Sequence, residues 1–145
     1  MTYTVADMAP VLDKESQGLI IPKEIETHFA NITLKSDGIV RVKFRADIDF
    51  EMEDAKLLFE VLRSFYKGEK LLVLIHTGEG VMISQEAREY TASNEVSAIV
   101  QADAVVVNNL STHLLVRSIE AFYHPQRLMK YFKTENEAIS WLKSL

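Results

Sequence analysis

The sequence predicts an α/β domain built on a mixed, mostly parallel β-sheet. Its most apolar short run is Leu71–Ile75, which has the length of a strand and is too short for a helix. Apolar side chains occupy both alternating faces of this run, which is typical of an interior strand covered on both sides. Helix-like segments precede and follow it. We therefore expect the second strand of a β-α-β crossover, with a parallel neighbour.

Two strands joined by a tight turn are predicted to begin the sheet, over residues 29–34 and 39–44. The connection contains Asp37-Gly38, a strong turn signal because both residues tolerate positive φ. One face of the second strand carries three cations: Arg41, Lys43 and Arg45. That face is expected to be solvated or to meet acidic groups.

A helix is predicted over residues 52–67, because apolar residues recur there at spacings of three and four. Gly68 follows as a stop signal. Before the helix, Asp47 and Asp49 lie two apart, but no further oxygen ligands follow at the spacing of a calcium loop. These residues are therefore interpreted as a polar loop that caps the helix.

A second helix is predicted over residues 84–94, with Ser84 as its N-cap. Gly78 and Gly80 precede it, but the lysine and the glycine spacing of a phosphate-binding loop are missing. Both glycines are therefore interpreted as turn residues.

The last third of the chain continues the alternation of strands and helices. We expect a covered strand at residues 104–107, a helix over 111–123, a short strand at 128–132 and a final helix after the capping box at 134–137. The predicted order is β-β-α-β-α-β-α-β-α.

Residues 1–26 are predicted to form an N-terminal extension packed on one domain, residues 27–145. Residues 22–26 fit a helical turn, because proline suits the first helical position. The polar face of the hairpin suggests that the helices gather on one side of the sheet, yet the later strands are apolar on both faces. The extension or a second copy of the chain must then cover the other side, which favours a homodimer.

Composition excludes several classes of function. The chain has 145 residues, of which 48% are apolar and 26% charged, as in an ordinary globular domain. A net charge of −5 argues against a nucleic-acid binder. The absence of cysteine excludes disulfides, thiolate metal sites and cysteine nucleophiles. No secretion signal and no membrane-spanning run is present, so we expect a cytoplasmic protein without membrane insertion.

Two stretches carry a family resemblance. The first is the valine strand within Ala102–Asn108, followed by Leu110-Ser111, and the second is the strand and closing helix within Met129–Leu142. Together they resemble the SpoIIAA-like (STAS/SEC14-type) family, in element order over about residues 32–145. The resemblance implies a mixed sheet flanked by helices, usually without enzyme activity, and we expect no cofactor.

The resemblance also implies two kinds of site. Better-known members of the wider fold are anti-sigma-factor antagonists, switched by phosphorylation of a serine in an Asp-Ser-Ser-Gly-type motif at a helix start. Residues 76–84 contain no such motif, although Ser84 has a similar helix-start position. The SEC14-like side of the family suggests a lipid-sized pocket.

Polar residues gather at the predicted carboxyl ends of two parallel strands, where ligands of open sheets bind. The helix N-termini expected there suit an anion. The candidate ligand or anion site comprises His76, Thr77, Ser84, Asn108, Ser111 and His113. Alternatively, the serines are helix caps and the histidines are ordinary surface residues. No nucleophile with a spaced base partner and no metal-ligating set can be named.

The leading hypothesis is a non-enzymatic STAS-like domain that acts as a protein-interaction or regulatory module, as a homodimer with an unidentified protein partner. The second hypothesis is a small-molecule or lipid-binding domain, with its ligand at the carboxyl edge of the sheet or under the extension. A deep, partly apolar cavity favours the second. An enzyme that uses His76 or His113 is the third.

Overall fold

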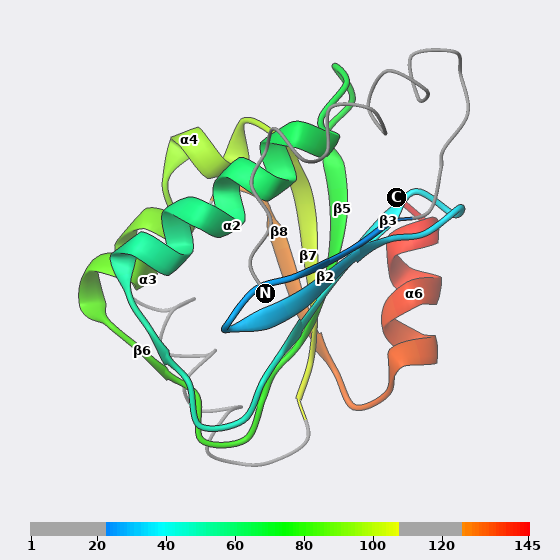
Figure 1. Cartoon of the computed structure of the whole chain (residues 1–145). Helices are drawn as coiled ribbons and strands as arrows, with labels where there is room; N and C mark the ends of the chain where they lie inside the picture. Colours follow the sequence, from blue (N-terminus) through cyan, green and yellow to red (C-terminus); the bar gives the residue numbers. More distant parts are fainter. Residues whose placement is uncertain (1–22, 108–125) are drawn as a thin grey trace.

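A six-stranded sheet in the order β1-β2-β3-β5-β7-β8 forms the centre of the computed structural model, which describes residues 23–107 and 126–145 (Figure 1). The strands are β1 (Lys23–Glu26), β2 (Ala30–Leu34), β3 (Ile39–Phe44), β5 (Leu71–His76), β7 (Val100–Val106) and β8 (Leu128–Phe132). The first three are antiparallel, and β3, β5, β7 and β8 run parallel. The predicted mixed sheet is therefore confirmed.

Helices lie on both faces of this sheet. One face is covered by α2 (Met52–Phe65), α3 (Gln85–Thr91) and α4 (Asn94–Ser97), and the other by α6 (Glu135–Lys143) (Figure 1). Strand alternation divides the core accordingly. In β5, Val73 packs in the larger cluster under α2, whereas Leu74 packs in the smaller cluster under α6.

Helix α6 covers the second apolar face of the later strands, which the sequence led us to assign to another element. Ala138 and Leu142 of α6 are fully buried against the sheet, where they meet apolar side chains of β3, β5 and β7. α6 therefore supplies the cover that we assigned to the N-terminal extension or to a second copy. The apolar second face of the later strands no longer argues for a homodimer.

The hairpin between β2 and β3 forms as predicted. The Gly38 amide donates to the Lys35 carbonyl at 2.9 Å, and Gly38 has a φ of 82°. The Asp37 carboxylate accepts a hydrogen bond from the Ile39 amide at 3.0 Å. These bonds fix the register in which Ile32 lies opposite Val42.

The helical turn predicted over residues 22–26 is wrong where the structure describes it. Lys23–Glu26 is strand β1 and pairs with β2, so that Ile25 lies opposite Ile32. Ile25 is fully buried between exposed neighbours, which is the alternation of a half-covered strand. The sheet therefore begins within the predicted extension, and residues 1–22 lie outside the described part of the chain.

Two other predicted boundaries differ. The helix predicted over 84–94 divides into α3 and α4, because the Ser93 hydroxyl accepts from the Val96 amide at 3.4 Å and caps a new helical turn. The strand predicted at 104–107 begins at Val100. The helix predicted over 111–123 lies outside the described residues.

A short parallel ribbon extends beyond the carboxyl edge of the sheet and leads into α2 and α3 (Figure 1). It consists of β4 (Asp49–Phe50) and β6 (Met82–Ile83). The Asp47 amide donates to the Glu79 carbonyl at 2.8 Å, and Asp47 has a φ of 57°. The predicted polar loop therefore contains a strand and is paired along its length with the segment that follows β5.

Replacement of Gly78 is expected to disrupt this ribbon. A Cβ at this position would lie 2.4 Å from the Arg45 carbonyl oxygen, so the backbone must move. We expect Gly78→Ala to lower the free energy of unfolding by about 2 kcal/mol or more, measured by urea denaturation.

Gly68→Ala is the matched control. No atom lies within 4 Å of its added Cβ, so only the φ of +94° is unfavourable there, at about 1 kcal/mol. An equal or smaller loss for Gly78→Ala would contradict close packing between the two segments.

Candidate functional site

A cavity of about 120 Å³ lies on the α2 face of the sheet, at its carboxyl edge. The sheet contributes side chains from four parallel strands, α2 contributes Leu58, and the β4–β6 ribbon contributes Phe50 and Ile83. Most of the described lining is aliphatic or aromatic; the sheet residues of this kind are Phe44, Ile75, Val105 and Met129. The surface is thus that of an apolar binding pocket with few polar groups.

Two threonine hydroxyls are among the polar groups of this cavity. Thr77 follows β5 and donates its hydroxyl proton to the Val106 carbonyl at 3.0 Å. Thr91 ends α3 and donates its hydroxyl proton to the Arg88 carbonyl at 3.0 Å. Both hydroxyl oxygens keep capacity to accept a further hydrogen bond.

A buried ion pair also lines the cavity. Arg127 Nε lies 2.5 Å from Asp103 Oδ2, and the two side chains are 6% and 4% exposed. The other guanidinium nitrogens donate to Ser97 Oγ at 2.9 Å and to the Thr91 carbonyl at 2.6 Å. Arg127, the residue before β8, is therefore bound to the middle of β7 and to both α3 and α4.

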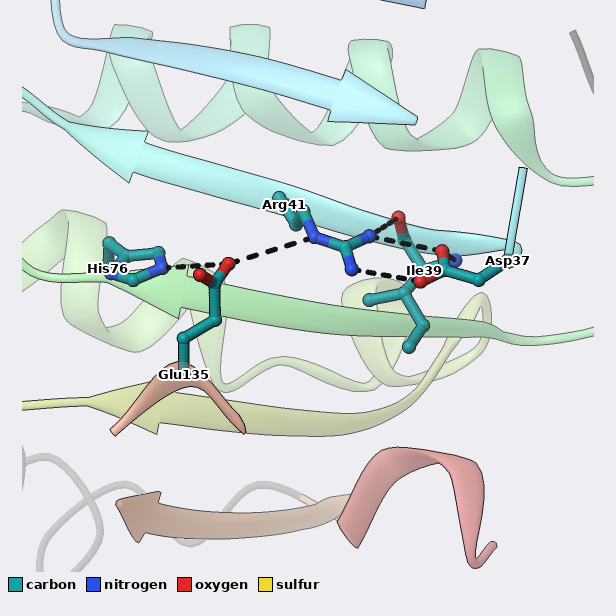
Figure 2. A network of polar contacts seen from close by, with 5 residues as sticks. All are labelled: Asp37, Ile39, Arg41, His76 and Glu135. Atoms are coloured by element: carbon teal, nitrogen blue, oxygen red, sulfur yellow. Dashed lines mark hydrogen bonds and ion pairs between the residues drawn. The ribbon is translucent and has the colours of Figure 1, made fainter. Parts of the chain in front are cut away.

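A second polar group lies on the opposite face, under α6. Figure 2 shows Asp37, Arg41, Glu135 and His76 in one chain of contacts. The Arg41 guanidinium binds both Asp37 carboxylate oxygens, at 3.0 and 2.8 Å. The Glu135 carboxylate lies 3.9 Å from Arg41 Nε and 3.4 Å from His76 Nε2. These contacts hold the first turn of α6 against β3 and β5.

This network partly explains the cationic face of β3. Arg41 meets two carboxylates, as the sequence allowed, whereas Lys43 and Arg45 remain exposed. Buried Arg41 Nε has no hydrogen-bond acceptor. Its ion pair with Glu135 therefore compensates its charge without completing its hydrogen bonding.

Among the described residues of the predicted site, the structure separates His76 from Thr77. His76 contacts Glu135 on the α6 face, whereas Thr77 lines the cavity on the α2 face. Successive residues at the end of a strand point to opposite faces, and this separates the two. Ser84 caps α3 by accepting from the Ala87 amide at 3.1 Å, and it lies in a shallow hollow with acidic neighbours: Glu51, Glu86 and Glu89.

The remaining predicted site residues, Asn108, Ser111 and His113, lie outside the described part of the chain. Sequence reasoning missed Asp103 and Arg127. The signal for Asp103 was a lone acid between alanines, directly before the strand that we expected to be covered, since an acid that becomes buried requires a partner.

Within residues 23–107 and 126–145, no cluster of three or more His, Asp or Glu side chains is arranged to hold a metal ion. None of the helices described there is long and apolar enough to cross a membrane.

Comparisons with known proteins identify the fold and a family. A family model described as "Domain of unknown function (DUF7793)" matches residues 32–145. No curated protein matches the chain. The chain is similar to the crystal structure of an uncharacterized protein from the DUF3478 family of Shewanella loihica PV-4, which is described as having a SpoIIAA-like fold. The TM-score is 0.50 at 14% identity, over 84% of this chain and 92% of that chain. This confirms the SpoIIAA-like fold that the sequence resemblance implied.

Breaking the buried ion pair is expected to be strongly destabilising. Asp103→Asn leaves the Arg127 charge buried without a counterion, so we expect a loss of about 3–5 kcal/mol in the free energy of unfolding, measured by chemical denaturation. Asp49→Asn, at an exposed carboxylate, is the control. A loss as small as that of the control would show that Arg127 does not depend on Asp103.

The Asp37–Arg41 contact predicts a dependence of stability on pH. The hydrogen bond from the Arg41 side chain is the main reason that the pKa of Asp37 lies below its ordinary value of 3.8. A lowered folded-state pKa gives stability that is fully present above the ordinary, unfolded-state pKa of 3.8. This stability is lost as the pH falls through the folded-state pKa.

The unfolding free energy of the native chain should therefore exceed that of Asp37→Asn by a constant amount above about pH 5. The difference should shrink below about pH 4. Carbon-13 NMR of the Asp37 carboxyl group measures its titration directly, and a midpoint at or above 3.8 would contradict the prediction.

Proposed function

The chain belongs to the family described as "Domain of unknown function (DUF7793)", and for this member we propose a non-catalytic function in which the cavity binds a small apolar molecule. The observation that carries the proposal is the apolar cavity itself, at the carboxyl edge of parallel strands. This edge is where open sheets with parallel strands bind ligands. The proposal adopts the second hypothesis from the sequence, for which such a cavity was the distinguishing feature.

The size of the cavity sets the size of the ligand. An engineered cavity of about 150 Å³ lined by leucine, isoleucine and phenylalanine binds benzene. The cavity here, about 120 Å³ with a similar lining, suits one small ring or a short branched alkyl group. We expect a ligand of this size, with about seven heavy atoms, to bind the cavity with a dissociation constant of roughly 10 μM to 1 mM.

The polar lining supports binding rather than catalysis. Asp103 and Arg127 are the titratable side chains among the described lining residues, and they bind each other. The hydroxyls of Thr77 and Thr91 donate to backbone carbonyls, so the acceptor of each of these hydrogen bonds is not a side chain that could serve as a base. A nucleophile would require such a base.

A protein-interaction or regulatory role is the second candidate, and the edge of the sheet favours it. β8 is an edge strand of the sheet formed by the described residues, and Leu128 is 54% exposed. Edge strands pair with added strands of other chains. A homodimer, a protein partner and a cytoplasmic location all remain predictions.

A phosphoserine switch at Ser84 is not favoured by its surroundings. Glu51, Glu86 and Glu89 line the same hollow as Ser84. A phosphate group there would add negative charge beside three carboxylates. The proposed function therefore does not involve modification of this serine.

Toluene tests the proposal. We expect it to bind the full chain with a dissociation constant of roughly 1 mM or below, and to shift the amide NMR signals of cavity residues such as Ile75 and Val105. Val81→Phe is expected to abolish binding, because Val81 lines the cavity and the larger side chain fills it.

Met82→Phe is the matched control, since Met82 directly follows Val81 and is 66% exposed. It should leave toluene binding unchanged. Failure of the folded native chain to bind toluene would overturn the proposal.

A further inference from the structure

We infer that the cavity selects a small apolar molecule that carries an N–H or O–H donor, of the phenol class, over an anion or a pure hydrocarbon. This inference rests on the proposed function, because it concerns the ligand of the same cavity. It follows from the direction of the hydrogen bonds around the described lining.

The two threonine hydroxyls have already used their protons. Val106 O and Arg88 O are carbonyl oxygens and can only accept, so the Thr77 and Thr91 hydroxyls must donate to them. Each hydroxyl oxygen retains lone pairs. Toward a ligand, both threonines are therefore hydrogen-bond acceptors.

In the buried ion pair, Asp103 adds a further acceptor, and most of the Arg127 donors are already used. Three of the five N–H groups of the Arg127 guanidinium donate to protein oxygens, namely Asp103 Oδ2, Ser97 Oγ and the Thr91 carbonyl, and one N–H remains on each of the two terminal nitrogens. The Asp103 carboxylate has acceptor capacity beyond its one bond to Arg127 Nε. The pair is neutral as a whole, so it offers no net positive charge to an anion.

The polar part of the described lining is therefore made mainly of acceptors, on Thr77, Thr91 and Asp103, and its remaining donors belong to a guanidinium that Asp103 neutralises. A hydroxyl or N–H group on the ligand can donate to these acceptors, whereas a carboxylate would face mostly oxygen atoms and a guanidinium whose charge is already neutralised. The SEC14-like resemblance suggested a lipid-sized pocket. Among lipids, a fatty acid is disfavoured here, because its head group is an anion without a hydrogen-bond donor. An apolar ring with one donor satisfies both the apolar walls and the acceptors.

Three probes of similar size separate the possibilities: toluene, phenol and benzoate. We expect phenol to bind more tightly than toluene, although toluene gains more from leaving water, and benzoate to bind least. Dissociation constants are measured by NMR titration of the full chain. The double variant Thr77→Val/Thr91→Val removes both hydroxyl acceptors at nearly constant shape.

In that double variant we expect phenol affinity to fall about three- to tenfold, the effect of one hydrogen bond, with toluene affinity retained. Retained toluene binding also shows that the variant folds with its cavity intact. Thr33→Val is the control, because Thr33 lies on β2 away from the cavity, and it should change neither affinity.

The outcomes separate this inference from the proposed function. If toluene binds but phenol is no tighter, or if the double variant weakens both probes equally, the donor preference is overturned and the cavity remains a binding site. Benzoate as the tightest probe would also overturn it, because Arg127 would then be receiving an anion. If none of the three binds, the proposed function itself fails.

Discussion

The buried ion pair between Arg127 and Asp103 is the contact on which the arrangement around the cavity depends. Asp103 lies in the middle of β7, on the face that packs under the helices, where an unpaired carboxylate would be costly. Arg127 neutralises it and reaches Ser97 and the last residue of α3 with its other nitrogens. A single side chain thus fixes β7, the start of β8 and two helices relative to one another. It also supplies the charged end of a lining that is mostly apolar.

Two polar regions lie on opposite faces of the sheet at the end of β5, and the contacts described above do not connect them. His76 belongs to the network with Glu135 under α6, and Thr77 belongs to the cavity under α2. The first region is made of charges that compensate one another and anchor a helix. The second is made of acceptors surrounded by apolar walls. The candidate ligand site is therefore the second, although the histidine was the more conspicuous residue in the sequence.

Local signals in the sequence predicted the parts of the fold that depend on local chemistry. Asp37-Gly38 predicted the hairpin, the apolar run at Leu71–Ile75 predicted the central strand, and Thr134 predicted the start of α6. The ribbon of β4 and β6 was missed because two-residue strands have no readable period. The cover by α6 was missed because it depends on where that helix packs, which no local pattern records. The partner of Asp103 lies 24 residues away, so its identity required the fold.

The β4–β6 ribbon has a consequence for how the length of the chain can vary. Residues 47–50 and 79–84 are hydrogen-bonded to each other outside the main sheet, and Gly78 packs directly on the Arg45 backbone. The connections from β3 to α2 and from β5 to α3 therefore cannot gain or lose residues independently. An insertion in either would break the pairing and displace one wall of the cavity. Among the described residues, the backbone hydrogen bonds of the exposed turn at Lys35-Ser36 stay within the β2–β3 hairpin, so this turn is the better place to accommodate added residues or a fused tag.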